Sequence, residues 1–358
     1  MIAQSRPRCT KGEVAALCLA LGLGLACSSP PQGGTGGAAG SGSGPPPTAT
    51  QCFADDFVNA AAAPDVDYDQ FRPTLGRHCN GTNHQNISGV QRVVFLGDSI
   101  TVGTPPSGIP EFYRTRLALA LAQKFGIQPP DEIWKNLDVI NGTSLSRTSG
   151  AFASCAEWGA RTDDFIRDGG QIELCFPESE RSKRTLVIVT MGGNDIANIA
   201  KKGATMAPPY TELFAQTEQF VTYMRNAVQW FKGDPAKFPN GVFIVFANNY
   251  EFTDGTADTS VCPAAAAAGL GTPWQDTNAL KNILIRANEQ YMRIAVETQT
   301  DMLLLAEAFC GHGYKSTDRN APCYRGPNQQ NWFDLTCIHP NPVGHQQISN
   351  MFMSVINE

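Results

Sequence analysis

Residues 93–103 read Val-Val-Phe-Leu-Gly-Asp-Ser-Ile-Thr-Val-Gly. The four apolar residues that open this stretch are typical of a buried strand, which should end at Gly97, where glycine allows a sharp turn. In an open α/β sheet, ligands bind at the carboxyl ends of the strands, beside the N-termini of the helices that follow. Ser99 is therefore predicted to lie where a nucleophile would be useful, although Gly97-Asp98-Ser99 also fits an ordinary turn with a helix N-cap.

Similar apolar runs recur along the chain and alternate with helical patterns. The runs that predict strands are 93–96, 138–140, 186–190, 242–247 and 302–306. Helices are predicted over 211–232, with Gly233 as a stop, over 277–297, and from Asn341-Pro342 towards the end of the chain. This alternation favours a parallel sheet covered on both faces. We expect an α/β fold, a three-layer α/β/α sandwich around a parallel sheet of about five strands.

The first 27 residues have the pattern of a signal peptide. Three basic residues precede an apolar stretch over 14–26, which is too short to span a bilayer. The stretch ends in Gly-Leu-Ala-Cys at 24–27, which resembles the lipobox of bacterial lipoproteins except that leucine is usual where Gly24 stands. We expect export and a lipid anchor at Cys27, in the outer membrane or at the cell surface. Ordinary cleavage and secretion is the alternative.

The segment after the signal peptide has a different composition from the rest of the chain. Residues 28–50 consist mostly of Gly, Ser, Pro and Ala and cannot bury enough apolar surface to become ordered. We therefore predict a disordered linker over 28–50. No second break of this kind follows, so 51–358 is predicted to form one folded domain that carries the candidate site, and we expect a monomer.

Charge and cysteine content limit the partners and the compartment. The chain has 27 basic and 33 acidic residues, a net charge of −6, and no basic run of the kind that binds nucleic acid. An even number of cysteines follows the signal segment and predicts a disulfide framework in an exported protein: Cys52, Cys79, Cys155, Cys175, Cys262, Cys310, Cys323 and Cys337. The pairing stays open, although Cys52 with Cys79 and Cys155 with Cys175 would close local loops.

The sequence disfavours a metal site. It contains no Cys-x-x-Cys spacing among these cysteines, and an oxidising compartment favours disulfides over zinc. Asp254 and Asp258 lie in a segment that resembles a small calcium loop, but two carboxylates in a turn more often face solvent. We therefore expect neither a metal nor a cofactor.

A serine nucleophile needs a base, and the chain has only five histidines. His339 stands out because it lies between the last predicted strand and the last predicted helix, hence at the same edge of the sheet as Ser99. His345 falls one turn into that final helix and is expected to be structural. The other three lie in predicted loops or before the first strand: His78, His84 and His312.

Several blocks together resemble the GDSL or SGNH hydrolase superfamily. Its members keep a Gly-Asp-Ser block, a central glycine, a Gly-x-Asn-Asp block and a late Asp-x-x-His-Pro block. The matching segments here are Gly97-Asp98-Ser99-Ile100, with isoleucine in place of leucine, Gly192-Gly193-Asn194-Asp195, and His339-Pro340-Asn341 with Gly344. Gly159 is the best candidate for the central glycine, with Gly142 and Gly150 as competitors. The resemblance covers the chain from Arg92 onward and implies a flavodoxin-like fold.

The resemblance implies a role for each matched residue. Ser99 would attack an acyl carbonyl, and His339 would accept its proton and return it to the leaving group. The oxyanion would be bound by the N–H groups of Ser99 and Gly159 and by the side-chain amide of Asn194. Gly97, Asp98, Gly192 and Asp195 would support these residues.

The acid of the triad departs from the family pattern. The aspartate usually stands three residues before the histidine, but that position is Thr336 here, and the nearest upstream aspartate is Asp334. A loop bent by a disulfide at Cys337 could bring Asp334 onto the imidazole, whose second nitrogen needs a partner to fix its tautomer. We favour Asp334, with a backbone carbonyl as the alternative.

The resemblance implies a serine esterase that hydrolyses carboxylic esters through an acyl-enzyme. An α/β-hydrolase fold is disfavoured because no Gly-x-Ser-x-Gly elbow is present. The ester stays open between an acetylated polysaccharide, a lipid and a small or short-chain ester, because selectivity resides in the loops. Two alternatives remain: an acyltransferase on the same triad, and a non-catalytic surface binding protein on the hydrolase scaffold.

Overall fold

The computed structural model describes residues 46–60 and 65–358. The predicted signal peptide at 1–27, its Cys27 anchor and most of the predicted linker lie outside these residues. Helix α2 (Ala49–Phe53) begins just inside the predicted linker, and Thr48 caps it by accepting a hydrogen bond from the N–H of Gln51. No helix among the described residues is long and apolar enough to cross a membrane.

The centre of the molecule is a six-stranded sheet with the order β4-β5-β1-β6-β7-β8. Its strands are β4 (Thr148–Ser149), β5 (Phe152–Ser154), β1 (Arg92–Gly97), β6 (Thr185–Thr190), β7 (Val242–Ala247) and β8 (Asp301–Leu303). All neighbours are parallel except β4 and β5. The five parallel strands follow the flavodoxin-like order 2-1-3-4-5, which confirms the predicted fold class.

The strand predicted at 138–140 is wrong. β2 (Leu137–Asp138) pairs only with β3 (Thr143–Ser144), in a separate two-stranded sheet. Val139 and Ile140 are 56% and 83% exposed, so the apolar pattern there marks a turn at the surface. The strand beside β1 is instead β5, whose Phe-Ala-Ser sequence is too short and mixed to give an apolar signal.

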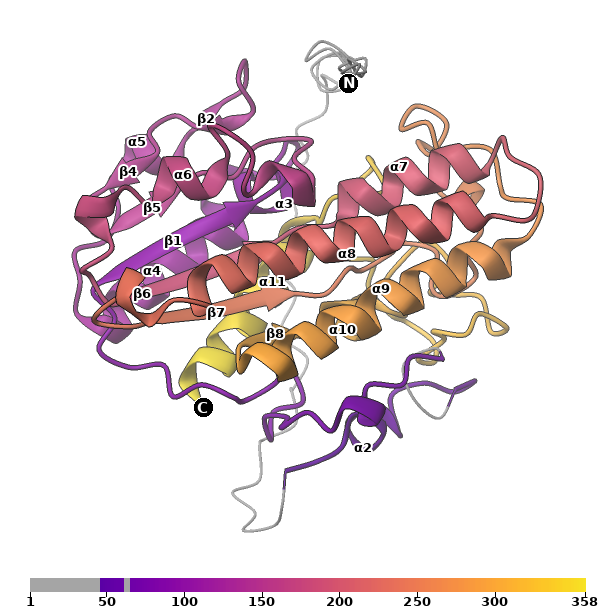
Figure 1. Cartoon of the computed structure of the whole chain (residues 1–358). Coiled ribbons are helices and arrows are strands. Elements are labelled where there is room, and N and C mark those ends of the chain that lie inside the picture. Colours follow the sequence, from indigo (N-terminus) through magenta and orange to yellow (C-terminus); the bar gives the residue numbers. More distant parts are fainter. Residues whose placement is uncertain (1–45, 61–64) are drawn as a thin grey trace, which may run out of the picture.

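Helices cover both faces of the sheet (Figure 1). α8 (Thr211–Lys232) and α9 (Thr277–Thr298) pack together on one face, and α4 (Tyr113–Phe125) and α11 (Pro342–Asn357) pack together on the other. α8 has its predicted ends, and Asn341 caps α11 by accepting hydrogen bonds from the N–H groups of Val343 and Gly344. This is the expected three-layer sandwich.

The remaining helices are short and lie between the larger elements. The α-helices are α3 (Ser99–Val102), α5 (Glu132–Lys135), α6 (Gln171–Cys175), α7 (Gly193–Gly203) and α10 (Leu305–Phe309). The 3-10 helices are η1 (Asp69–Phe71), η2 (Ile109–Glu111), η3 (Thr162–Asp164), η4 (Glu178–Glu180), η5 (Pro235–Lys237) and η6 (Thr259–Val261). β8 ends at Leu303, earlier than predicted, because the chain turns into α10.

Four disulfides connect the long loops. Cys52–Cys79 and Cys155–Cys175 are the two local pairs expected from the sequence. The other two are Cys310–Cys323 and Cys262–Cys337. The last of these joins the loop after β7 to the turn that precedes His339. Sequence spacing could not reveal this pairing because the two cysteines stand 75 residues apart.

Candidate active site

The sequence blocks that contain Ser99, Gly159 and Asn194 meet where the strand order of the sheet reverses. Ser99 follows β1 and begins α3, Gly159 lies on the loop after β5, and Asn194 follows β6 at the start of α7. β5, β1 and β6 are adjacent parallel strands, so their carboxyl ends share one edge. In doubly wound sheets this switch point is where ligands bind.

Gly97 and Asp98 shape the turn that presents Ser99. Gly97 has φ +145°, and a Cβ atom there would lie 2.3 Å from the carbonyl oxygen of Thr190, so only glycine fits. The side chain of Gln171 holds the same residue by accepting its N–H at 2.8 Å and donating to its C=O at 2.7 Å. Asp98 caps α3 by accepting a hydrogen bond from the N–H of Ile100. These contacts fix the position of the Ser99 backbone.

Ser99 and His339 are in direct contact although 240 residues separate them. Oγ of Ser99 lies 2.8 Å from Nε2 of His339, and both side chains are buried. The backbone of the histidine loop is fixed because the N–H of Asp334 donates to the C=O of His339, and Phe333 pairs with Pro340. The fold therefore brings the predicted nucleophile and base together from segments that are far apart in the sequence.

The other imidazole nitrogen contacts a threonine. Nδ1 of His339 lies 2.8 Å from Oγ1 of Thr336, and that hydroxyl donates to Oδ1 of Asp334. The expectation that Asp334 reaches the imidazole directly is therefore wrong: in the described residues its Oδ1 accepts from the N–H and O–H of Thr336, and its buried Oδ2 has no partner. The physical reason is that Asp334 closes a tight turn onto Thr336, which leaves the threonine facing the ring.

The direction of these hydrogen bonds determines the histidine tautomer. Because the Thr336 hydroxyl gives its proton to Asp334, only a lone pair of its oxygen faces Nδ1. Nδ1 must then carry the ring proton, and Nε2 is left to accept the proton of Ser99. Burial lowers the pKa of His339 to about 4, so the ring is neutral at pH 7. Burial raises the pKa of Asp334 to about 6, which leaves it ionised at pH 7.

The three expected oxyanion donors lie on loops that follow three adjacent strands of the sheet. Among the residues that the structure describes, the backbone N–H groups of Ser99 and Gly159 donate to no other group. The Asn194 amide donates one N–H to the C=O of Ala160 at 2.9 Å, which places it beside Gly159 and leaves its second N–H available. Asn194 lines the cavity next to Ser99, whereas Gly159 is exposed and does not line it.

Asp195 and Gly192 hold the start of α7. Asp195 is buried and accepts hydrogen bonds from the N–H and the hydroxyl of Thr162, at 3.0 and 3.3 Å, which ties α7 to the loop that contains Gly159. Gly192 has φ +119°, and a Cβ atom there would lie 2.5 Å from Oδ1 of Asn249. Burial raises the pKa of Asp195 to about 7, as it does that of Asp98.

Other residues singled out from the sequence serve the fold. Gly142 packs against Trp158, and Gly150 lies in the turn between β4 and β5. Asp254 is fully buried and accepts hydrogen bonds from the N–H groups of Gly311, Gly313 and Lys315, and Asp258 caps η6. His345 is buried against Phe112 and Tyr113, and His312 stacks on Trp332.

Two residues of the site were not predicted from the sequence. Gln171 holds Gly97 from a helix 74 residues away, and no local signal marks it. Thr336 could have been recognised, because its hydroxyl stands at the position where a carboxylate is usual. A hydroxyl can accept a hydrogen bond from the imidazole and donate another to Asp334.

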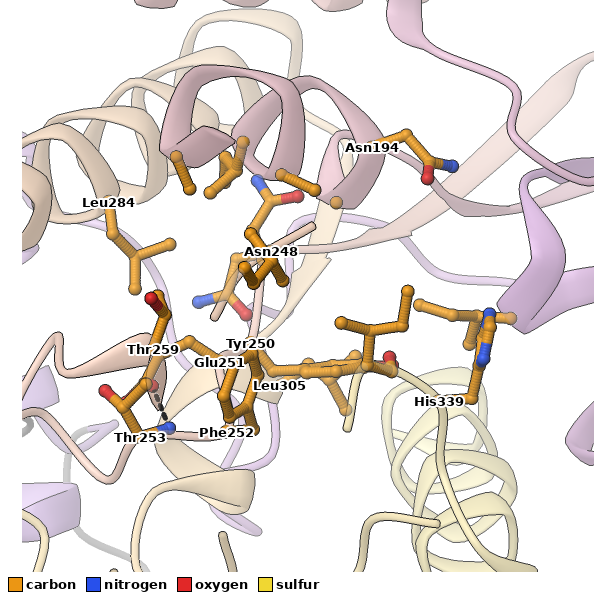
Figure 2. A pocket seen from close by; sticks show the side chains of 18 of the residues that line it. Asn194, Asn248, Tyr250, Glu251, Phe252, Thr253, Thr259, Leu284, Leu305 and His339 are labelled. Atoms are coloured by element: carbon orange, nitrogen blue, oxygen red, sulfur yellow. Dashed lines mark hydrogen bonds between the residues drawn. The ribbon is translucent and has the colours of Figure 1, made fainter. Parts of the chain in front are cut away.

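Ser99 and His339 lie at one end of a pocket that is open to solvent and encloses about 1090 Å³ of space, part of it open solvent. Figure 2 shows Asn194 and His339 at this end, Tyr250 near the middle and Leu284 and Thr253 at the far end. Most of the lining is apolar and comes from α7, α9 and the loop after β7. The site can therefore admit an elongated molecule up to the serine.

The chain is similar to several solved structures that are described as lipases. A GDSL-like lipase from Parabacteroides merdae, described as putative, shares 16% identity with a TM-score of 0.44, over 77% of this chain and 99% of its own. An extracellular lipase from Streptomyces rimosus shares 16% (TM-score 0.43; 74% and 100%), and a phospholipase A1 from Streptomyces albidoflavus shares 20% (TM-score 0.43; 75% and 98%). No curated protein matches the sequence.

The family assignment rests on the sequence model of a known family. The GDSL-like Lipase/Acylhydrolase model matches residues 95–347, which is well over half of the 358-residue chain and includes Ser99, Asn194 and His339. This protein therefore belongs to the GDSL-like lipase/acylhydrolase family, whose members act on esters.

Proposed function

We propose that this protein is a serine esterase that hydrolyses carboxylic esters through an acyl-enzyme. His339 takes the proton of Ser99 while Oγ attacks the ester carbonyl, and the resulting imidazolium gives that proton to the departing alcohol. A water molecule then attacks the acyl-Ser99 ester with His339 again as base, which releases the acid and restores the serine. The observation that carries this proposal is the 2.8 Å contact between the serine hydroxyl and a neutral, buried imidazole.

Two further groups complete the proposed mechanism. The oxyanion of each tetrahedral intermediate would accept hydrogen bonds from the N–H groups of Ser99 and Gly159 and from the Asn194 amide. Asp334 would act on His339 through Thr336, since its carboxylate holds the threonine hydroxyl in the orientation that accepts from Nδ1. No step in this mechanism requires a cofactor.

The location of the enzyme is part of the proposal. Four disulfides are consistent with export to an oxidising compartment. We propose that the exported protein is attached to the membrane by a lipid at Cys27 and acts there as a monomer on an ester substrate, without a nucleic-acid partner.

A fluorophosphonate probe tests the nucleophile. We expect the wild-type protein to take up one probe per chain on the peptide that contains Ser99, and Ser99→Ala to take up none, as read by mass spectrometry. Ser107→Ala is a suitable control because the Ser107 hydroxyl is buried without a partner in the described residues. Equal labelling of wild type and Ser99→Ala would contradict the proposal.

Asn194→Ala is expected to lower kcat by about a hundred- to a thousandfold, because one preorganised oxyanion donor is lost. KM should change little, since the ground-state carbonyl needs the donor less than the oxyanion does. Steady-state kinetics on a soluble ester would measure both constants. A matched control is Asn320→Ala, which changes an exposed loop asparagine. A KM effect without a kcat effect would place Asn194 in substrate binding alone.

A further inference from the structure

We infer that the loop after β7 positions the base of the reaction: the Cys262–Cys337 disulfide and the hydroxyl of Tyr250 hold the turn that carries His339. Both act through the backbone of that turn, so these are positioning residues. The inference rests on the proposed function, because the base needs positioning only if Ser99 is the nucleophile. The positioning residues lie outside the short sequence blocks that resemble the family.

The segment that carries the base is a turn closed at its two ends. We call residues 333–340 the histidine turn, since its first and last residues pair in an antiparallel bridge. The imidazole and the Thr336 hydroxyl that contacts it both belong to this turn. The 2.8 Å contact between His339 and Ser99 therefore depends on the backbone conformation of the turn. Leu335 is 65% exposed, so this side chain adds little burial that could hold the turn.

The disulfide fixes the backbone between Thr336 and Ile338. Cys337 is fully buried and has φ +74°, a left-handed conformation that a residue with a Cβ atom rarely adopts. Such a conformation persists only where the surrounding structure holds it. The bond to Cys262, which is itself buried on the loop after β7, supplies that constraint. Relaxation at Cys337 would rotate the peptides on either side and displace His339.

The Tyr250 hydroxyl fixes the peptide that joins Ile338 to His339. It donates to the C=O of Ile338 at 2.8 Å, and the Tyr250 side chain points towards the His339 segment in Figure 2. Its ring stacks on Phe309 with the centroids 4.6 Å apart and packs edge-to-face on Phe333 at 5.3 Å. Burial raises the pKa of the Tyr250 phenol well above its usual range, so the hydroxyl keeps its proton and remains a donor.

The loop after β7 is tied to a second loop that also contacts the histidine turn. Asp254 in the first loop is fully buried, and its carboxylate accepts three backbone N–H groups of the segment 311–315. Within that segment the N–H of Tyr314 donates to the C=O of Phe252 at 2.9 Å. The Tyr314 hydroxyl donates to the C=O of Asp334 at 2.6 Å. The histidine turn is therefore held by two loops that are bonded to each other.

A purely structural role is the alternative to positioning, because a cross-link between distant residues stabilises a folded chain in any case. The two roles differ in what they predict for residue 337. Stabilisation by a cross-link is lost to the same extent whichever residue replaces Cys337. Positioning depends on the left-handed backbone there, which glycine adopts readily and alanine does not.

Cysteine substitutions test this difference. Cys262→Ala with Cys337→Ala should lower kcat about a hundredfold on a soluble ester and change KM little, because a misplaced base slows the chemistry and not the binding. Cys262→Ala with Cys337→Gly should recover at least about fivefold of that loss. Steady-state kinetics below the melting temperature of every variant measures both constants. As a control, Cys52→Ala with Cys79→Ala removes another disulfide and should lower the melting temperature but keep kcat within about twofold.

Tyr250→Phe tests the hydrogen bond without disturbing the packing of the ring. It should lower kcat about tenfold, because one hydrogen bond to the histidine turn is lost. Tyr68→Phe is the matched control, since the Tyr68 hydroxyl is buried and donates to Glu307 at 2.7 Å. The control should keep kcat within about twofold even if it lowers the melting temperature. The low-field NMR signal of Nδ1–H of His339 should be weakened by exchange with water in Tyr250→Phe and unchanged in Tyr68→Phe.

The outcomes separate this inference from the proposed function. A normal kcat and NMR signal in Tyr250→Phe, with Ser99→Ala inactive, would overturn the inference and leave the esterase proposal standing. Equal losses for Ala and Gly at Cys337 would reduce the disulfide to a stabilising cross-link and overturn the inference as well. If the cysteine variants do not fold, Tyr250→Phe and its NMR signal decide the matter. Hydrolysis that survives Ser99→Ala would instead contradict the proposed function itself.

Discussion

Ser99→Ala and His339→Ala are each expected to lower kcat by about ten thousand- to a millionfold on a soluble ester. The contact between Oγ and Nε2 at 2.8 Å means that either change removes the proton transfer on which serine attack depends. The double variant should be hardly slower than either single variant, because the two side chains act as one unit. Some residual catalysis is expected, since the oxyanion donors remain.

The measurement is single-turnover and steady-state kinetics on purified variants with matched thermal unfolding curves. Both side chains are buried, so an equal melting temperature is needed to exclude a loss of folded protein. Effects of the two substitutions that simply add in free energy would show that Ser99 and His339 do not act together. In that case the short contact would have to be explained as a structural hydrogen bond.

The fold could be predicted from the sequence where apolar runs were long. β1, β6 and β7 each span six residues, and their apolar runs predict these strands. β5 has three residues, one of them serine, which is too short a segment to predict a strand. The prediction at Ile140 is wrong because an apolar residue on an exposed turn looks the same in sequence as one in a buried strand.

The sequence predicts those positions in the site that depend only on the order of strands and helices. A residue that directly follows a parallel strand must lie at the carboxyl edge of the sheet, so Ser99 and Asn194 could be placed there before any geometry was known. The partner of Nδ1 of His339 could not be predicted in this way, since it depends on the conformation of a short turn. Cys337 in this turn has φ +74° and is tied to Cys262, and neither property can be inferred from the spacing of residues.

Thr336→Val is expected to lower kcat by about a hundred- to ten-thousandfold, with little change in stability. Valine keeps the shape of threonine but cannot accept a hydrogen bond from Nδ1, so the ring loses the partner that fixes its tautomer. Thr336→Ser keeps the hydroxyl and should retain most of the activity. If Thr336→Val reacts at a near-normal rate while Ser99→Ala does not, the threonine has no role in positioning the base.

The pH profile distinguishes this positioning role from a purely structural one. The wild-type kcat/KM should fall as the pH drops below about 6, where Asp334 takes up a proton and no longer holds the Thr336 hydroxyl, because burial raises the pKa of Asp334 to about 6. A second fall is expected near pH 4, where the base itself is protonated, because burial lowers the pKa of His339 to about 4. Thr336→Val should lose the step near pH 6 and keep the step near pH 4.

Substitutions of Asp334 and Thr336 test whether Asp334 acts on His339 through the Thr336 hydroxyl. Asp334→Asn removes the negative charge that holds the Thr336 hydroxyl and should lower kcat about ten- to a hundredfold when Thr336 is present. This loss is smaller than that expected for Thr336→Val, because the threonine oxygen still faces the ring. Thr336→Asp places a carboxylate three residues before His339, as in the usual family pattern. In that background Asp334→Asn should have almost no effect on kcat, since the imidazole then has its own acid. If Asp334→Asn is equally damaging in both backgrounds, Asp334 supports the turn and does not act through Thr336.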